Sequence, residues 1–235
     1  MHDLIIRNAT IVDGSGGPAF EGDVAISQGL IREVGRVTGR GAQELEAKGS
    51  LLVPGFIDAH THYDGQVRWD PLLTPSCWHG VTTTLFGNCG VGFAPVRPGS
   101  EEWLIGLMEG VEDIPGVALA EGMRWQWESF PQYMDALASQ SYIMDIGLHV
   151  PHGPVRTYVM NQKGTRNESA STEELRQMAA LVRAGMEAGA LGVSTSRTLN
   201  HLSKEGEPVP GTFADEAELR AMQRIAPMPS YFPGI

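Results

Sequence analysis

The chain has 235 residues, enough for one large domain or for one domain with a small companion. Hydrophobic residues make up 42% and charged residues 19%, which is ordinary for a globular protein and argues against a disordered chain or a coiled coil. The net charge of -11 opposes binding to phosphate backbones and anionic lipid surfaces, so we expect neither a nucleic-acid nor a membrane partner.

Cysteine usage and the N-terminus bear on the compartment. The two cysteines, Cys77 and Cys89, are too few for a disulfide framework and fit a reducing environment. The first residues, MHDLIIRNATIVDG, lack the pattern of a cleaved signal peptide, and no run of about 18 apolar residues follows. We therefore expect a cytoplasmic protein.

The first fifty residues contain short apolar runs separated by glycine-rich turns. The runs LII, TIV, DVAI and LIREVG have the spacing of a small sheet built from hairpins. A further run passes through Pro54-Gly55, where the missing N–H donor of proline and the freedom of glycine mark the end of an element. We place a domain boundary there, giving a small β domain over 1–53 and a second domain over 54–235.

After Pro54, apolar strand-like runs alternate with helical patterns. We expect strands over 56–62, 81–88, 142–150 and 190–196, and helices over 101–110, 129–139, 171–188 and 215–224. This alternation predicts an α/β fold with a parallel sheet, either doubly wound or a β/α barrel. Four such units are half of an eight-unit barrel, and the last ten residues, with three prolines, contain no fifth strand. We therefore expect an interrupted architecture, as in a fragment, a frameshifted product or an unusual short form.

The strongest chemical signal is the sequence Asp58-Ala59-His60-Thr61-His62 at the end of an expected strand. Because strand side chains alternate between faces, Asp58, His60 and His62 should point to one side. Two imidazoles can then reach one metal ion, while a carboxylate orients a ring or joins the coordination. The pattern predicts a metal site at the carboxyl end of this strand.

A second signal, Gly87-Asn88-Cys89-Gly90, follows the next expected strand. The thiol of Cys89 should lie at the same end of the sheet, between glycines that allow close approach of backbone and ligand. A metal-bound cysteine is a thiolate, whose soft sulfur favours zinc. The alternative is a small buried thiol in a turn.

Several stretches together resemble a known family. VPGFIDAHTHYD resembles the first-strand signature of the amidohydrolase superfamily, and GVTTTLFGNCGVGFAP resembles its N-acyl-D-amino-acid deacylase, or D-aminoacylase, branch. EAGALGVSTS and the hairpin-rich beginning agree with this branch, so the resemblance runs from about residue 4 to about residue 220.

The resemblance implies a small β-sandwich built from both chain ends and a TIM-like β/α barrel of the metal-dependent hydrolase type, about half of which is present. It implies that His60, His62 and Cys89 hold zinc, as one or two divalent ions, with Asp58 at the edge of the site. The family's remaining ligands and its proton-shuttling aspartate come from later strands and have no counterpart in this sequence, so no catalytic residue is assigned.

Other polar residues at strand ends are candidates for substrate contact. His149 and His152 follow the third expected strand, and Ser196 and Arg197 follow the fourth. The planar guanidinium of Arg197 suits a substrate carboxylate. For each residue a packing or solvated role is the competing interpretation, and we expect a structural role for Cys77 and His79. The aromatic run Trp125, Trp127, Phe130 and Tyr133 should form a packed subdomain rather than a ligand cage.

We therefore predict a metal-dependent hydrolase similar to N-acyl-D-amino-acid deacylases, which would cleave the linear amide of an N-acyl amino acid or a related small molecule with a metal-activated water. One alternative is a cyclic-amide hydrolase or deaminase of the same superfamily. Another is a catalytically inactive half-barrel, which would expose a strand edge and self-associate through it.

Overall fold

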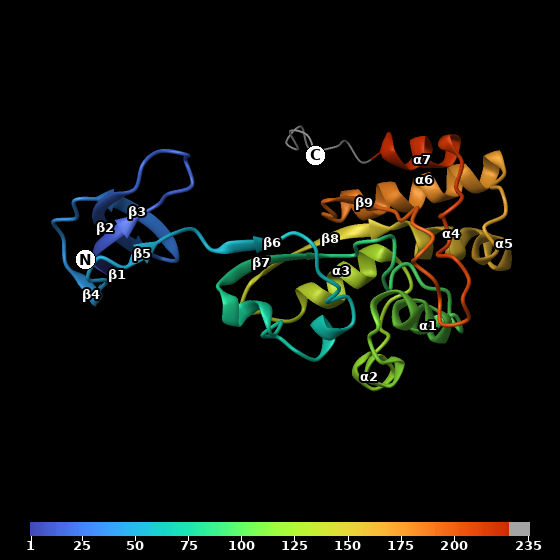
Figure 1. Ribbon diagram of the computed structural model, residues 1–235, viewed down its shortest axis with the longest axis horizontal. Coiled ribbons are helices and arrows are strands. Elements are labelled where there is room, and N and C mark those ends of the chain that lie inside the picture. The colour runs from blue at the N-terminus through green and yellow to red at the C-terminus, as the bar shows by residue number, and fades with distance from the viewer. Residues whose placement is uncertain (226–235) are drawn as a thin grey trace. The chain divides into compact units, whose positions relative to one another are not determined.

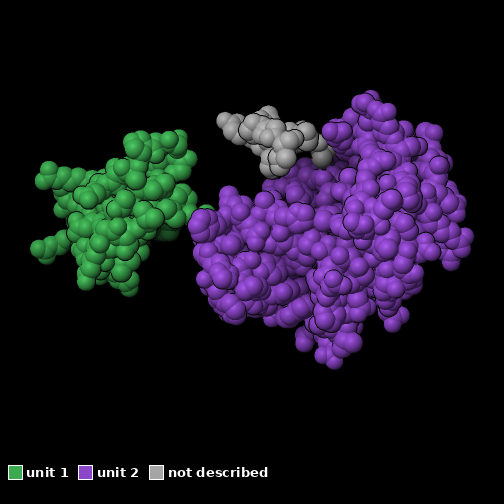
Figure 2. All heavy atoms as spheres, viewed as in Figure 1, with its two compact units in different colours: residues 1–55 green, residues 56–235 purple. Residues whose placement is uncertain are grey.

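The computed structural model describes residues 1–225. The chain divides into two compact units, Met1–Gly55 and Phe56–Ile235, which Figure 2 shows in green and purple. The prediction that no fifth strand forms concerns the last ten residues, which lie outside the described part of the chain.

The first unit is a five-stranded sheet made of β1 (His2–Ile11), β2 (Phe20–Ser27), β3 (Leu30–Gly35), β4 (Gly41–Glu46) and β5 (Leu51–Leu52). Its order is β3-β2-β1-β4, and β5 also pairs with β1. The expected hairpins are the antiparallel pairs β1–β2 and β2–β3, whereas β4 and β5 run parallel to β1. The resemblance implied a small β-sandwich built from both chain ends, and the structure describes a β-rich N-terminal unit with one five-stranded sheet.

Two details of this sheet differ from the expectation. The runs LII and TIV belong to one strand, β1, whose register shifts between Ile6 and Ala9 around Asn8, a residue with a φ of 53°. Strand β4, GAQELE, gave no sequence signal because its side chains are largely exposed and polar, and it pairs with β1 through the backbone.

The second unit contains a parallel sheet of β6 (Phe56–Asp58), β7 (Val81–Phe86), β8 (Asp145–Pro151) and β9 (Gly192–Ser194). These strands lie side by side in chain order, as Figure 1 shows. Such an order is that of a β/α barrel rather than of a doubly wound sheet, and the α/β half-barrel prediction is confirmed. Within residues 1–225 no further strand pairs with β6 or β9, and self-association through these edges stays a prediction.

Seven helices and two 3₁₀ turns accompany this sheet in the described part of the chain. They are η1 (Gln66–Arg68), η2 (Ser76–His79), α1 (Glu101–Glu112), α2 (Gly116–Gly122), α3 (Phe130–Ala138), α4 (His152–Met160), α5 (Gln162–Thr165), α6 (Thr172–Glu187) and α7 (Glu216–Gln223). Helix α6, expected over 171–188, starts at a capping box in which Ser171 and Glu174 bond each other's backbone N–H. Helix α4 was missed because its first turn contains Gly153 and Pro154, although proline is tolerated in a first turn.

The aromatic run packs against the segment that follows the histidine pair. Trp127, Phe130 and Tyr133 are buried, and the Trp127 ring lies 4.7 Å from that of Tyr133, centroid to centroid. The Tyr133 hydroxyl donates to the backbone oxygen of Asp64 at 2.7 Å. The cluster therefore anchors the loop after β6. Between residues 1 and 225 the structure has no helix with the length and apolar character needed to cross a bilayer.

Candidate metal centre

Three donor side chains meet at the carboxyl ends of β6 and β7. One ligand atom each from His60, His62 and Cys89 lies within 4.8 Å of the other two. The parallel register pairs Asp58 with Thr84, and the N–H of Thr61 donates to the oxygen of Leu85 at 3.0 Å. These backbone bonds bring the loop after β6 to the turn that carries Cys89.

The turn around Cys89 is held by glycine conformations and by one amide. Gly87, Cys89 and Gly90 have φ values of 76°, 54° and 71°, a region that favours glycine. Nδ2 of Asn88 donates to the oxygens of Thr61 and Leu85, each at 3.1 Å. The buried Asn88 amide therefore locks the two ligand-bearing segments together, and Sγ of Cys89 lies 3.3 Å from Nε2 of His60.

The two ring nitrogens of His62 lie in different surroundings. Its Nδ1 is buried and has no hydrogen-bond partner, whereas its Nε2 lies 3.2 Å from Oε1 of Glu112. Burial, assisted by nearby His60 and His201, lowers the pKa of His62 to about 4. The ring is therefore neutral near pH 7, the form that binds metals.

The acidic groups around the centre are also perturbed. Burial raises the pKa of the Cys89 thiol to about 11, with Glu112 and Asp64 adding to the effect. Burial likewise raises the pKa of Asp64 to about 8 and that of Glu112 to about 7. Burial is the main cause of each shift, and a bound cation would oppose it by favouring the ionised forms.

The donor set fits zinc. One thiol and two imidazoles are ligands that zinc prefers, and an unpartnered buried nitrogen is available on His62. Within the described residues the group offers three donors. Catalytic zinc sites have this number of protein ligands and leave the fourth coordination position to water or substrate.

Asp58 lies outside this group. Strand β6 ends at Asp58, so the expected alternation over 56–62 stops there and a loop, not a strand, presents the histidines. One carboxylate oxygen of Asp58 accepts from Ser76 Oγ at 3.2 Å, and the other accepts from the N–H of His60 at 3.5 Å. In this position Asp58 supports the loop that carries His60.

The predicted substrate-contact residues differ in accessibility. His149 is partly buried and its Nδ1 lies 3.1 Å from Oδ1 of Asn88, beside the Cys89 turn. His152 has no exposed surface. Its two ring nitrogens contact Thr195 Oγ1 at 2.9 Å and Glu218 Oε1 at 2.8 Å. The structure thus gives His152 protein partners on both sides.

Ser196 and Arg197 lie on the segment after β9. Ser196 is buried, with Oγ 3.0 Å from Nδ1 of His201, while Arg197 is exposed and donates to the oxygen of Ala214 at 3.0 Å. A Cβ on Gly90 would lie 3.1 Å from the nitrogen of Ser196, so this segment packs directly against the turn that carries Cys89.

Three residues near the centre were assigned no role from the sequence. Asp64 extends the two-residue spacing of His60 and His62, a signal that could have identified it. Glu112 ends a helix far along the chain, and His201 begins a hairpin closed by the bridge between Leu202 and Pro208. Neither of these two has a local pattern, since only the fold brings them close.

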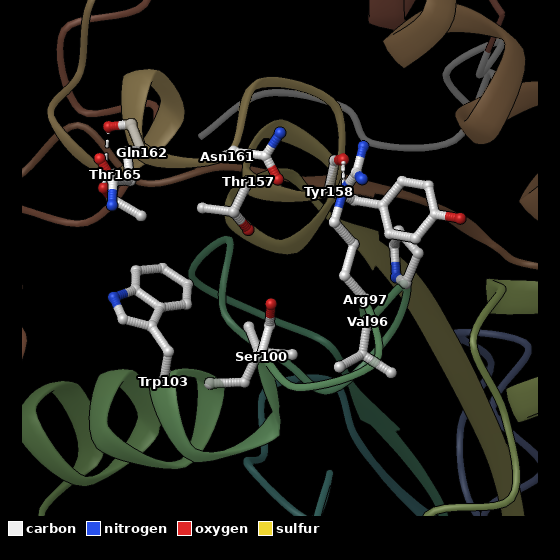
Figure 3. Close-up of a pocket in the computed structure, with 11 residues that line it drawn as sticks. Val96, Arg97, Ser100, Trp103, Thr157, Tyr158, Asn161, Gln162 and Thr165 are labelled. Carbon is white, nitrogen blue, oxygen red and sulfur yellow. Dashed lines mark hydrogen bonds between the residues drawn. The ribbon is translucent and has the colours of Figure 1, made fainter.

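A separate pocket of about 460 Å³ lies between α1 and the α4–α5 segment. Figure 3 shows Trp103 and Ser100 across from Thr157 and Tyr158, with the Arg97 guanidinium 5.0 Å from the Tyr158 ring centroid. No residue of the three-donor group lines this pocket, so it is distinct from the candidate metal centre.

Comparison with known proteins defines the class. The model of the Amidohydrolase family matches residues 43–231, and the chain belongs to this family. N-acyl-D-aspartate deacylase of Alcaligenes xylosoxydans xylosoxydans is 34% identical over 194 residues, which cover 82% of this chain and 36% of that protein. D-aminoacylase of the same organism is 30% identical over 194 residues, which cover 82% of this chain and 37% of that protein. The chain thus spans little more than a third of the length of these relatives.

Solved structures agree with this placement. A crystal structure of D-aminoacylase, described as defining a novel subset of amidohydrolases, superposes with a TM-score of 0.76 at 27% identity and covers 96% of this chain and 43% of that one. N-acyl-D-glutamate deacylase from Bordetella bronchiseptica, complexed with zinc and a phosphonate inhibitor, superposes with a TM-score of 0.73 at 28% identity. The match covers 96% of this chain and 43% of that one. The half-barrel is therefore shown, and within the family the chain is similar to the deacylases.

Proposed function

We propose that this chain forms the metal-binding part of an amidohydrolase that cleaves the linear amide bond of N-acyl-D-amino acids. The observation that carries the proposal is the convergence of His60, His62 and Cys89 at the ends of adjacent parallel strands. The names of the similar deacylases support the substrate class.

In this proposal His60, His62 and Cys89 hold the metal, and Asn88 fixes the turn that presents the thiol. Zinc at such a site supplies a Lewis acid for the amide carbonyl and lowers the pKa of water to about 7. Asp58 keeps its supporting contacts with Ser76 and with the N–H of His60.

The substrate carboxylate needs a cation near the centre. Arg197 lies three positions beyond β9 and is exposed, so its guanidinium is available for a bidentate contact. His149, beside the Cys89 turn, is the proposed neutral contact. His152 and Ser196 would act by holding their neighbours, since both are buried.

Metal content tests the centre directly. Plasma mass spectrometry of the purified chain should find close to one zinc, which is lost in Cys89→Ala and retained in Cys77→Ala, the matched control at the other free cysteine. The same proteins are then assayed with N-acetyl-D-amino acids and their L-enantiomers. Zinc retained in Cys89→Ala would contradict the proposed ligand set.

Replacing Arg197 tests the substrate class. Losing a charged hydrogen-bonded partner costs about 1.5–3 kcal/mol, so Arg197→Ala should lower kcat/KM roughly 10- to 100-fold. Arg220→Ala, at another exposed arginine, serves as the control. Equal activity of Arg197→Ala and the wild type would contradict an anchoring role for Arg197.

A deaminase of the same superfamily is the second candidate. It is favoured by a local similarity to adenine deaminase of Archaeoglobus fulgidus, 44% identical over 62 residues or 26% of this chain. Ammonia release from adenine, without hydrolysis of N-acyl-D-amino acids, would select this function. Zinc binding without either activity would identify an inactive half-barrel.

A further inference from the structure

The turn that carries Cys89 reaches the fourth strand of the parallel sheet. The turn follows β7, whereas Ser194 is the last residue of β9, and β8 lies between these two strands. A Cβ on Gly87 would overlap the oxygen of His149 on β8, so the turn crosses the end of β8 in close contact with its backbone. This path brings the turn within reach of the end of β9.

The hydroxyl of Ser194 bonds the backbone on both sides of Cys89. Its Oγ accepts from the N–H of Gly90 at 3.0 Å and donates to the oxygen of Gly87. A serine hydroxyl has one proton and two lone pairs, so it can make both bonds at once. Ser194 therefore joins the two ends of the turn, although it lies 104 positions beyond Gly90 in the chain.

The backbone of Cys89 needs such support. Its φ of 54° lies in the left-handed region, which is unfavourable for a residue with a side chain and persists where the surroundings hold it. The N–H of Gly153 donates to the oxygen of Gly90 at 2.9 Å and holds one end of the turn. Because Ser194 holds both ends, it fixes the conformation that directs the thiol toward His60.

We propose that Ser194 is a positioning residue of the metal centre, which holds the turn so that the Cys89 thiol meets His60 and His62. The inference rests on the proposed function only in taking Cys89 as a ligand. Groups that orient a metal ligand from outside the coordination sphere typically contribute about 10- to 100-fold to metal affinity. The metal centre then depends on β9, although its three donors come from the segments after β6 and β7.

Two substitutions and one control test this role in the full chain. Ser194→Ala removes the hydroxyl, whereas Ser194→Thr keeps it on a residue that suits a strand. Thr212→Val removes a buried hydroxyl that donates to the oxygen of Val209 at 2.7 Å, a comparable loss elsewhere in the second unit. Tryptophan fluorescence during urea unfolding checks that each variant folds.

Three measurements report on the turn itself. Peptide mass spectrometry follows the alkylation of Cys89 by iodoacetamide in the metal-free proteins at one pH, with Cys77 as the internal reference. Competition with a chromophoric chelator gives the zinc affinity, and the thiolate charge-transfer band of the cobalt-substituted protein reports the metal–sulfur bond. Hydrogen exchange at the Gly90 amide of the wild type, measured by NMR, tests the bond to Ser194 without any substitution.

We expect Cys89 to be alkylated several-fold faster in Ser194→Ala than in the wild type, with an unchanged rate at Cys77. Zinc affinity should fall about 10-fold in this variant, and the cobalt–thiolate band should weaken. Ser194→Thr should restore the wild-type values, Thr212→Val should keep them, and the Gly90 amide of the wild type should be protected from exchange.

Each of four results would overturn the role of Ser194 while leaving the metal centre intact. They are wild-type alkylation and zinc affinity in Ser194→Ala, the same changes in Thr212→Val, no recovery in Ser194→Thr, and rapid exchange of the Gly90 amide. Absence of zinc from the wild type would instead overturn the proposed function, and the alkylation rate of Cys89 would still decide whether Ser194 holds the turn.

Discussion

The thiol of Cys89 lies 3.3 Å from Nε2 of His60, a residue 29 positions earlier in the chain. The two residues follow different strands, β6 and β7, which are parallel neighbours and therefore end at the same edge of the sheet. This edge is where β/α folds place their chemistry. Because the contact depends on the register of β6 and β7, changes that disturb this register should affect metal binding.

Zinc binding at pH 8 should release about one proton from Cys89, in addition to part of a proton from Asp64, whose pKa burial raises to about 8. Burial raises the pKa of Cys89 to about 11, so the metal-free thiol is protonated, whereas His62, with its pKa lowered to about 4, is already neutral. Glu112, with a pKa raised to about 7, is mostly ionised at this pH. Affinity should therefore increase about tenfold per pH unit. Calorimetry in two buffers of different ionisation enthalpy measures the released protons, and a release that is no smaller in Cys89→Ala would contradict thiolate ligation.

Asn88→Asp should weaken both folding and zinc binding. Nδ2 of Asn88 donates to two backbone oxygens, and an aspartate would place an acceptor against them. We expect a loss of at least about 2 kcal/mol in the free energy of unfolding. All five tryptophans lie in the second unit, so their fluorescence during urea unfolding reports on that unit alone. Asn200→Asp, at an exposed position, should change the free energy by less than about 0.5 kcal/mol.

Glu218 should stabilise the second unit through a buried cluster. Its carboxylate contacts both His152 and Arg156, and all three side chains are almost fully buried. Removing one partner of a buried ion pair typically costs about 3–5 kcal/mol, which is the loss expected for Glu218→Gln at pH 7. Glu216→Gln breaks only an exposed pair with Arg220 and should cost less than about 1 kcal/mol. Equal losses in the two variants would contradict the buried cluster.

The effect of Glu218 should also depend on pH. Burial opposes ionisation, but hydrogen bonds with His152 and Arg156 outweigh it and hold the pKa of Glu218 below its ordinary value of 4.5. The stabilisation is therefore complete above pH 4.5 and is lost as the pH falls through the folded-state pKa. The difference between wild type and Glu218→Gln should shrink below that pH in urea titrations.

Two glycines of α1 should respond differently to alanine. A Cβ on Gly110 would overlap the backbone of Ser203 and Lys204, whereas a Cβ on Gly106 would lie 3.0 Å from the movable Cε of Lys204. We expect Gly110→Ala to lose about 1–3 kcal/mol through overpacking and Gly106→Ala to stay within about 1 kcal/mol, helped by the helix propensity of alanine. Limited proteolysis should show cleavage near Lys204 in Gly110→Ala alone. Equal resistance would contradict the packing of this hairpin on α1.

The sequence alone indicated the alternation of strands and helices, the resemblance to the deacylases, and the candidate group of His60, His62 and Cys89. These features depend on local patterns, each of which needs only a few consecutive residues. Such patterns are apolar periodicity, the residues that start a helix, such as Ser171 and Glu174 at α6, and glycine-flanked motifs. The length of β6 was overestimated because the loop after Asp58 has the composition of a strand.

Tertiary structure decided which nitrogen of His62 faces a carboxylate, and which carboxylate that is. Glu112 lies 3.2 Å from this ring because α1 packs beside the loop after β6, a relation that no local pattern encodes. In the same way, His152 follows a strand in the sequence, as site residues of β/α folds often do, but the fold buries it against Glu218 from α7. Long-range packing selects the partners of each polar side chain, because burial makes an unpaired polar group costly and a paired one stable.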